Sequence, residues 1–230
     1  MGKTYVFAGA SSKVAVATAE MLQANNQKVI GISTKEQRHA YNEFYRVDDY
    51  RFGQFPSIQQ AIDGLVYFPG SIVLKPFARL TEADFLSDFQ RNTLGAAAFV
   101  QAYLTELKKS PAASIVFVSS VAAQTGMPFH GSIATAKAGL EGLNKALAAE
   151  FAPSIRVNTV APSLSNTPLA EKLLNTPDKL EASHKRHPLK RIGEADDLAH
   201  AINFLLTEKS AWMTGHVLQV DGGMSNVRLM

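Results

Sequence analysis

The stretch AGASSKVA, residues 8 to 15, has the residue types that could hold a phosphate group. Gly9 permits a tight turn after an apolar run, and Ser11 and Ser12 offer hydroxyls and backbone N–H groups near the start of a helical pattern. A dinucleotide-binding turn needs further glycines, so that a pyrophosphate can approach the backbone. Lys13 and Ala15 stand in those places, so an ordinary glycine/serine turn into a helix stays open as the alternative.

Seven short apolar or β-branched runs are predicted to be strands: residues 4–9, 28–33, 45–48, 64–68, 114–119, 155–161 and 216–222. Their nearly continuous apolar character is typical of parallel strands that are covered on both faces. Amphipathic stretches lie between them, among them 14–25, 81–108, 133–151 and 195–206. The alternation predicts an α/β fold, a doubly wound parallel sheet with helices on both faces, in which ligands bind beyond the carboxyl ends of the strands.

The composition fits one globular domain over residues 1–230. The chain is 46% hydrophobic and 19% charged, with a formal net charge of +3 and no cysteine, which excludes disulfides and thiolate metal sites. The basic residues are scattered, which argues against a nucleic-acid partner, and the apolar runs are too short to span a bilayer. The first residues run into a strand pattern without a secretory signal, so we expect a cytoplasmic protein.

Five segments carry a similarity to a known family: IDGLVYFPG (62–70), FQRNTLGAAAFVQAYL (89–104), SIVFVSSVAAQTG (114–126), IRVNTVAPS (155–163) and residues 187–223. Together they resemble the classical short-chain dehydrogenase/reductase family, close to its 3-oxoacyl-carrier-protein reductases. The resemblance covers nearly the whole chain. It implies a Rossmann-like sheet and an NAD(P)-dependent oxidoreductase that acts on a carbonyl or alcohol group of a small molecule.

The family's catalytic residues correspond to Asn92, Ser120, position 133 and Lys137. In the family, the lysine binds the cofactor ribose and lowers the pKa of a tyrosine at position 133, one helical turn away. The serine polarises the substrate carbonyl, and the asparagine anchors a proton-relay water. This chain has Ile133, which carries no titratable proton, so the usual proton transfer cannot run through it. The plainer alternatives are that Lys137 is a solvated helix residue and that Ser120 caps a loop.

A reaction at this site needs another proton donor. His130 is a candidate catalytic residue, because histidine titrates near neutrality and lies three residues before position 133. Ser132, Tyr67 and a water held by Asn92 and Lys137 are the other candidates.

The end of the second predicted strand favours NADP over NAD. NAD-selecting members of this fold place an acidic residue there, whereas this chain has Ser33 and Thr34. Lys35 and Arg38 follow, and they could pair with a 2′-phosphate. These four residues are predicted to contact the cofactor. The other predicted cofactor contacts are Gly9, Ser11, Ser12, Lys13, Val14, Asp48, Gly70, Lys137, Pro162 and Thr167.

Departures from the family pattern cluster on the cofactor side. The glycine loop keeps only Gly9, and Lys13 could reach toward a pyrophosphate or into solvent. The family's N-N-A-G is YFPG at 67–70, and Ser163 replaces a glycine after Pro162. Two classes of function follow from this pattern. One is an oxidoreductase with an atypical proton donor, and the other is a redox-inactive relative that binds a ligand or partner.

Two further expectations concern surfaces of the molecule. Small residues on the two long helices, including Gly139 and Gly142, allow close helix approach, so we predict a homo-oligomer, with the family's tetramer as the expected state. By the family resemblance, residues 163–191 would form a lid over the substrate. Its leucines and basic residues would suit an anionic substrate, but the same pattern describes an ordinary amphipathic helix, which we favour. HKRH at 184–187 is interpreted as a solvated helix face without a metal.

Overall fold

The computed structural model describes residues 2–37 and 39–228. Its parallel strands form one seven-stranded sheet in the order β3-β2-β1-β4-β5-β6-β7. The bounds are β1 (Thr4–Ala8), β2 (Lys28–Ser33), β3 (Glu43–Arg46), β4 (Gly64–Tyr67), β5 (Ala113–Val118), β6 (Ile155–Pro162) and β7 (Val217–Val220). The direction of winding reverses between β1 and β4, which confirms the predicted doubly wound, Rossmann-like fold.

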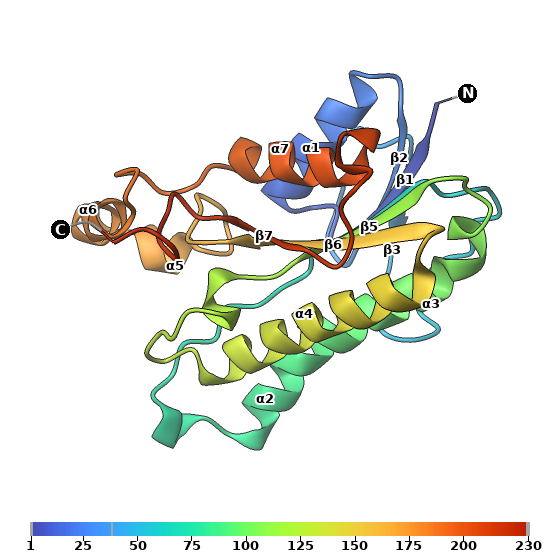
Figure 1. Cartoon of the computed structure of the whole chain (residues 1–230). Coiled ribbons are helices and arrows are strands. Elements are labelled where there is room, and N and C mark those ends of the chain that lie inside the picture. The colour runs from blue at the N-terminus through green and yellow to red at the C-terminus, as the bar shows by residue number, and fades with distance from the viewer. Residues whose placement is uncertain (1, 38, 229–230) are drawn as a thin grey trace.

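Helices cover both faces of this sheet (Figure 1). On one face lie α1 (Lys13–Gln23) and α7 (Ala195–Leu206), and on the other lie α3 (Gly95–Leu107) and α4 (Gly131–Phe151), with α2 (Glu82–Phe89) packed beside α4. The short helices α5 (Glu171–Leu174) and α6 (Pro177–Arg186) follow β6 beyond the carboxyl end of the sheet. The described residues also form four single helical turns. Three are 3-10 turns, η1 (Phe77–Arg79), η3 (Val121–Ala123) and η4 (Glu208–Ser210), and one is a π-helical turn, η2 (Gln90–Leu94).

The two hydrophobic cores explain why the strands are continuously apolar. Along β1, Val6 and Ala8 enter the core under α3 and α4, whereas Tyr5 and Phe7 enter the core under α1 and α7. Because successive side chains of a strand point to opposite faces, a strand covered on both sides needs an apolar residue at every position. Within residues 2–37 and 39–228, each helix is too short or too polar to cross a bilayer.

The edge strand β3 begins two residues before the predicted segment 45–48, so that boundary was wrong. Glu43 pairs in register with Ile30, and its carboxylate forms an ion pair with Lys28 at 2.6 Å. Val47 N still donates to Ser33 O at 3.0 Å, and the exposed Asp48 then leaves the sheet. Charged residues such as Glu43 are uncommon in strands, so the sequence pattern gave no reason to include it. Its ion pair with Lys28 on the neighbouring strand stabilises it there.

The helix predicted over 81–108 is interrupted by the π-helical turn η2, in which the backbone N–H of Gly95 reaches back to the carbonyl of Gln90. π-Helical turns are rare and recur at functional sites. This one places the Arg91 carbonyl against Tyr67, whose Oη donates to it at 2.6 Å. Gly95 lies where an added Cβ would overlap Tyr67 Oη, so its lack of a side chain makes room for this contact.

Gly95→Ala should lower the free energy of unfolding by about 2–3 kcal/mol, because the new methyl group displaces Tyr67 Oη from its buried hydrogen bond. Gly126→Ala is the control, since a Cβ there meets open space on an exposed loop, and it should change stability by less than about 0.5 kcal/mol. Urea unfolding measures both. Equal stabilities of the two variants would contradict the packing described.

Candidate active site

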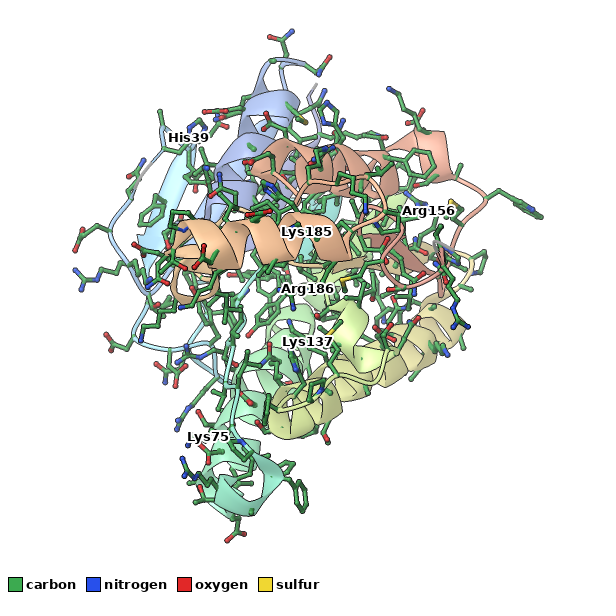
Figure 2. All side chains as sticks on the ribbon, turned by 90° about the vertical axis from the view of Figure 1, so that its left-hand side faces the viewer. His39, Lys75, Lys137, Arg156, Lys185 and Arg186 are labelled. Carbon is green, nitrogen blue, oxygen red and sulfur yellow. The ribbon has the colours of Figure 1, made fainter. Side chains whose placement is uncertain are left out.

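The turn after β1 and the loop after β4 meet at the point where the strand order reverses. Gly9 has a φ of +75°, and a Cβ there would lie 2.9 Å from Pro69 Cδ, so only glycine fits without strain. Gly70 follows Pro69 and faces the interior of the site, as described below. In doubly wound sheets, ligands bind at this point of reversal, beyond the carboxyl ends of the strands. Figure 2 looks onto this end of the molecule, with Lys137 near the centre and Lys185 and Arg186 of α6 above it.

The predicted serines connect the first two βα turns. Ser12 is the N-cap of α1, and its Oγ accepts the N–H of Ala15 at 3.1 Å. Ser33, buried at the end of β2, donates its hydroxyl to Ser11 Oγ at 2.9 Å and accepts the N–H of Lys35 at 3.1 Å. The end of β2 therefore presents hydroxyl groups where an NAD-selecting site has a carboxylate.

Lys13 lies on the surface at the first turn of α1. Its Nζ is 3.5 Å from the carbonyl oxygen of Asn166, in the segment after β6, and Asn166 in turn bonds the carboxylate of Glu194. This places an ammonium group at the N-terminus of α1, where the first N–H groups have no intrahelical acceptor. A positive charge at a helix N-terminus suits the binding of an anion. The contact of Lys13 with Asn166 also brings the segment that contains Thr167 next to the turn after β1.

Lys137 on α4 is only 5% exposed, so the interpretation as a solvated helix residue was wrong. Its Nζ donates to the carbonyl oxygen of Val118 at 2.6 Å, at the end of β5 and two residues before Ser120. Burial lowers the pKa of Lys137 to about 8, against the opposing effect of negative charge on Asp88 and Glu141. An amine with that pKa exchanges protons near neutral pH.

Asn92, in η2, is fully buried beside this lysine. Its Nδ2 donates to Ser71 Oγ at 2.9 Å and to the Asp88 carbonyl oxygen at 2.8 Å, and its Oδ1 finds no partner among the described residues. A Cβ added to Gly70 would lie 3.4 Å from Asn92 Oδ1 and 3.5 Å from Lys137 Nζ. Buried polar atoms almost always have partners, so this unpaired oxygen beside an ammonium group marks a place for a polar group or a water.

The remaining predicted catalytic residues lie on the segment between β5 and α4. Ser120 is the N-cap of η3, and its Oγ accepts the N–H of Ala122 at 3.2 Å, which leaves the hydroxyl proton free to donate. His130 precedes α4 with Nδ1 2.8 Å from the Pro128 carbonyl oxygen. Because it is seven residues from Lys137, it lies about 10 Å away along the helix axis.

Three further side chains bear on the missing proton. Ile133 is 4% exposed and lies one turn before Lys137. Tyr67 keeps its proton in the bond to the Arg91 carbonyl oxygen, and burial raises its pKa well above the usual value. Ser132 is buried, and its Oγ has no partner in the described part of the chain.

The other predicted cofactor contacts are spread along the same end of the sheet. Thr34 is half-buried and donates its N–H to Tyr50 Oη at 3.2 Å. Val14 is a buried residue in the first turn of α1, and Asp48 is exposed. Pro162 ends β6, and Thr167 is half-buried in the segment that follows. Arg38 lies outside the described residues.

Ser163, which replaces the expected glycine after Pro162, bonds His187 beyond the end of α6. The ring nitrogen Nδ1 of His187 lies 2.7 Å from the Ser183 carbonyl oxygen, which can only accept, so Nδ1 carries the proton. In the neutral ring, Nε2 then accepts the hydroxyl of Ser163 at 2.8 Å. This bond holds the end of α6 against β6. His187 is thus buried, so the interpretation of HKRH as a solvated face is wrong at this residue, whereas Lys185 and Arg186 are exposed.

Four polar residues of the site were not predicted from the sequence. Ser71 donates to Asp88 Oδ1 at 2.6 Å, and Ser119 donates to Glu141 Oε1 at 2.7 Å. Asp88 lies four residues before Asn92, and Glu141 lies four residues after Lys137. A carboxylate one turn from a predicted catalytic residue shares its helix face, and that spacing is the signal that could have found both.

Comparison with known proteins places this site in a family. Residues 52–225 match the family described as enoyl-(acyl carrier protein) reductase. The chain is 32% identical, over 97% of its own length and 97% of the relative's, to an uncharacterized short-chain type dehydrogenase/reductase of Sinorhizobium fredii. It is 30% identical to the 3-oxoacyl-[acyl-carrier-protein] reductase of Aquifex aeolicus, over 97% of this chain and 88% of that one.

Solved structures show the same fold. Aldohexose dehydrogenase of Thermoplasma acidophilum in ligand-free form has a TM-score of 0.90 and 25% identity, over 100% of this chain and 96% of that one. ElxO with NADP bound has a TM-score of 0.85 and 25% identity, over 97% of this chain and 99% of that one. The chain belongs to the short-chain dehydrogenase/reductase family, whose members are NAD(P)-dependent oxidoreductases.

Gly70→Ala should weaken NADPH binding about tenfold, because a methyl group would occupy the polar space between Asn92 Oδ1 and Lys137 Nζ. The contacts would be ordinary in length, so the free energy of unfolding should change by less than about 1 kcal/mol. Fluorescence titration with NADPH measures the affinity, with Gly126→Ala as the control. Unchanged affinity in Gly70→Ala would show that the cofactor does not reach this space.

Proposed function

We propose that this protein is an NADP-dependent reductase of a small carbonyl compound, in which Lys137 supplies the proton that a tyrosine at position 133 would otherwise give. One observation carries the proposal. The Lys137 ammonium is buried, yet it lies beside Gly70 and the unpaired Oδ1 of Asn92 at the ligand-binding end of the sheet. A buried cation next to an unpaired acceptor is expensive to maintain in a purely structural role.

The residues present fit a dinucleotide. Gly9 lets the first turn pass against Pro69 without a side chain, and the capped N-terminus of α1 carries the Lys13 ammonium. The unpaired Asn92 Oδ1 and the free protons of Lys137 offer acceptor and donor atoms at the other end of the crevice. Lys13 and the N-terminus of α1 would hold the pyrophosphate, and Lys137 would bind the nicotinamide ribose, as it does in the family.

Charge at the end of β2 favours NADP. Ser33 and Thr34 carry no charge, and the nearby Glu36 forms an ion pair with Arg46 at 2.5 Å. In the part of the chain that the structure describes, Lys35 has no carboxylate partner and is exposed. Lys35 can therefore pair with a 2′-phosphate. ElxO, a structural neighbour, has NADP bound.

The side chains then divide the chemistry of carbonyl reduction. NADPH held by these residues would supply the hydride for the carbonyl carbon. Ser120 donates its free hydroxyl proton as a hydrogen bond to the carbonyl oxygen. Lys137 gives a proton to the same oxygen as negative charge develops there, and the neutral amine stays anchored to the Val118 carbonyl. Ile133 contributes an apolar wall at the position from which a phenol would act.

A redox-inactive role is the second candidate, and it predicts that no nicotinamide cofactor binds.

Two separate proposals concern location and assembly: the protein is cytoplasmic, and it forms a homotetramer. Leu86, Phe89 and Leu94 are exposed on the α2–η2 surface, where the family pairs its long helices. Covering such apolar side chains favours association.

Fluorescence titration and NADPH oxidation with an activated ketone test the function. We expect a dissociation constant for NADPH in the micromolar range, at least about tenfold tighter than for NADH. Lys137→Met should lower turnover by about a hundredfold or more, because it removes the acid and keeps the length of the side chain. Lys145→Met, which removes an exposed lysine from the same helix, should keep full turnover. No binding at millimolar NADPH would favour the redox-inactive role.

A further inference from the structure

Asp88 is a carboxyl group inside the candidate site that the reaction above does not use. It lies on α2 with 1% of its surface exposed, and its Oδ2 has no partner among the described residues. A buried carboxylate is unfavourable unless charge or hydrogen bonds compensate it. Asp88 has one such bond, from Ser71, and it contributes negative charge at Lys137.

The chemistry of the donors fixes the direction of each hydrogen bond around Asp88. Asn92 faces the Asp88 backbone carbonyl, which only accepts, so the amide nitrogen must point there and Oδ1 must point toward Gly70 and Lys137. The same nitrogen donates to Ser71 Oγ. Ser71 therefore turns its own proton to Asp88 Oδ1. The chain runs from the Asn92 amide through Ser71 to the carboxylate, and each bond polarises the next.

We infer that Asp88 is a positioning residue of the active site. It orients Asn92 through Ser71, so that Oδ1 faces Lys137, and its negative charge keeps Lys137 in the ammonium form that acts as the acid. This inference rests on the proposed function, because it assigns Lys137 the role of acid.

Two carboxylates bear on Lys137, and they come from two helices. Asp88 lies on α2, and Glu141 lies one turn further along α4. Ser119 and Gln124 both donate to Glu141, at 2.7 and 2.8 Å, so both of its oxygens have partners on the loop after β5. On the loop after β4, Lys75 is paired with Asp84 at 2.6 Å. Of the two carboxylates, Asp88 raises the pKa of Lys137 more, and a single hydroxyl hydrogen-bonds to it.

Asp88→Asn tests this inference, since it keeps an acceptor for Ser71 and removes the charge. The measurement is the pH dependence of NADPH-driven ketone reduction. Without the carboxylate, Lys137 loses its proton at lower pH, so the pH at which turnover falls by half should move down by about one unit. Glu82→Gln is the matched control, because it removes an exposed carboxylate from the same helix, and it should leave the midpoint unchanged.

Ser71→Ala separates orientation from charge. It breaks the link between Asn92 and Asp88 and keeps the carboxylate, so kcat should fall by about tenfold with the midpoint unmoved. An unshifted midpoint in Asp88→Asn would overturn the electrostatic role. Full kcat in Ser71→Ala would overturn the orienting role, and this test stands even if Asp88→Asn fails to fold. A parent protein without turnover would instead refute the proposed function itself.

Discussion

A lysine ammonium held inside the protein is the constraint on which the site depends. An unpaired charge in the interior is strongly unfavourable, so its position requires an acceptor and negative charge close by. The Val118 carbonyl at the end of β5 is the acceptor, and Asp88 and Glu141 supply the charge. Burial still outweighs them and lowers the pKa of Lys137 to about 8. The same burial that makes the residue hard to accommodate thus makes it an acid suited to neutral pH.

Contacts of α2 and η2 with α4 hold the residues around Lys137 in place. Thr93, next to Asn92, donates its hydroxyl to the Ala136 carbonyl of α4 at 2.7 Å, so η2 is bonded to α4 one residue before Lys137. One turn nearer the N-terminus of α2, Phe89 lies against Gly139, where a Cβ would approach its ring to 3.1 Å. The π-helical turn therefore has a structural reason. It lies where Asn92 is buried, between α2, which packs on α4, and α3.

The sheet could be predicted from the sequence, because parallel strands that are covered on both faces are apolar at nearly every position. Local motifs in the sequence also pointed to Lys137, Asn92 and Ser120, whose catalytic roles stay predictions. Prediction from the sequence failed at β3, where an ion pair across the sheet brings Glu43 into the strand, and at η2, whose extra residue per turn leaves no distinct pattern in the sequence. Ser71 and Asp88 could not be read as partners, since only the folded chain brings them together across 17 positions.

The pH dependence of the parent enzyme tests the central claim, that Lys137 donates the proton, most directly. The measurement is single-turnover reduction of an activated ketone at saturating NADPH, from pH 6 to pH 10. Because the acid is the ammonium form, present below its folded pKa, the rate should be constant at low pH and fall as the pH rises through about 8 with the loss of one proton. A rate that already falls with a midpoint near 6.5, as expected for histidine, or that does not change across the range, would contradict the claim.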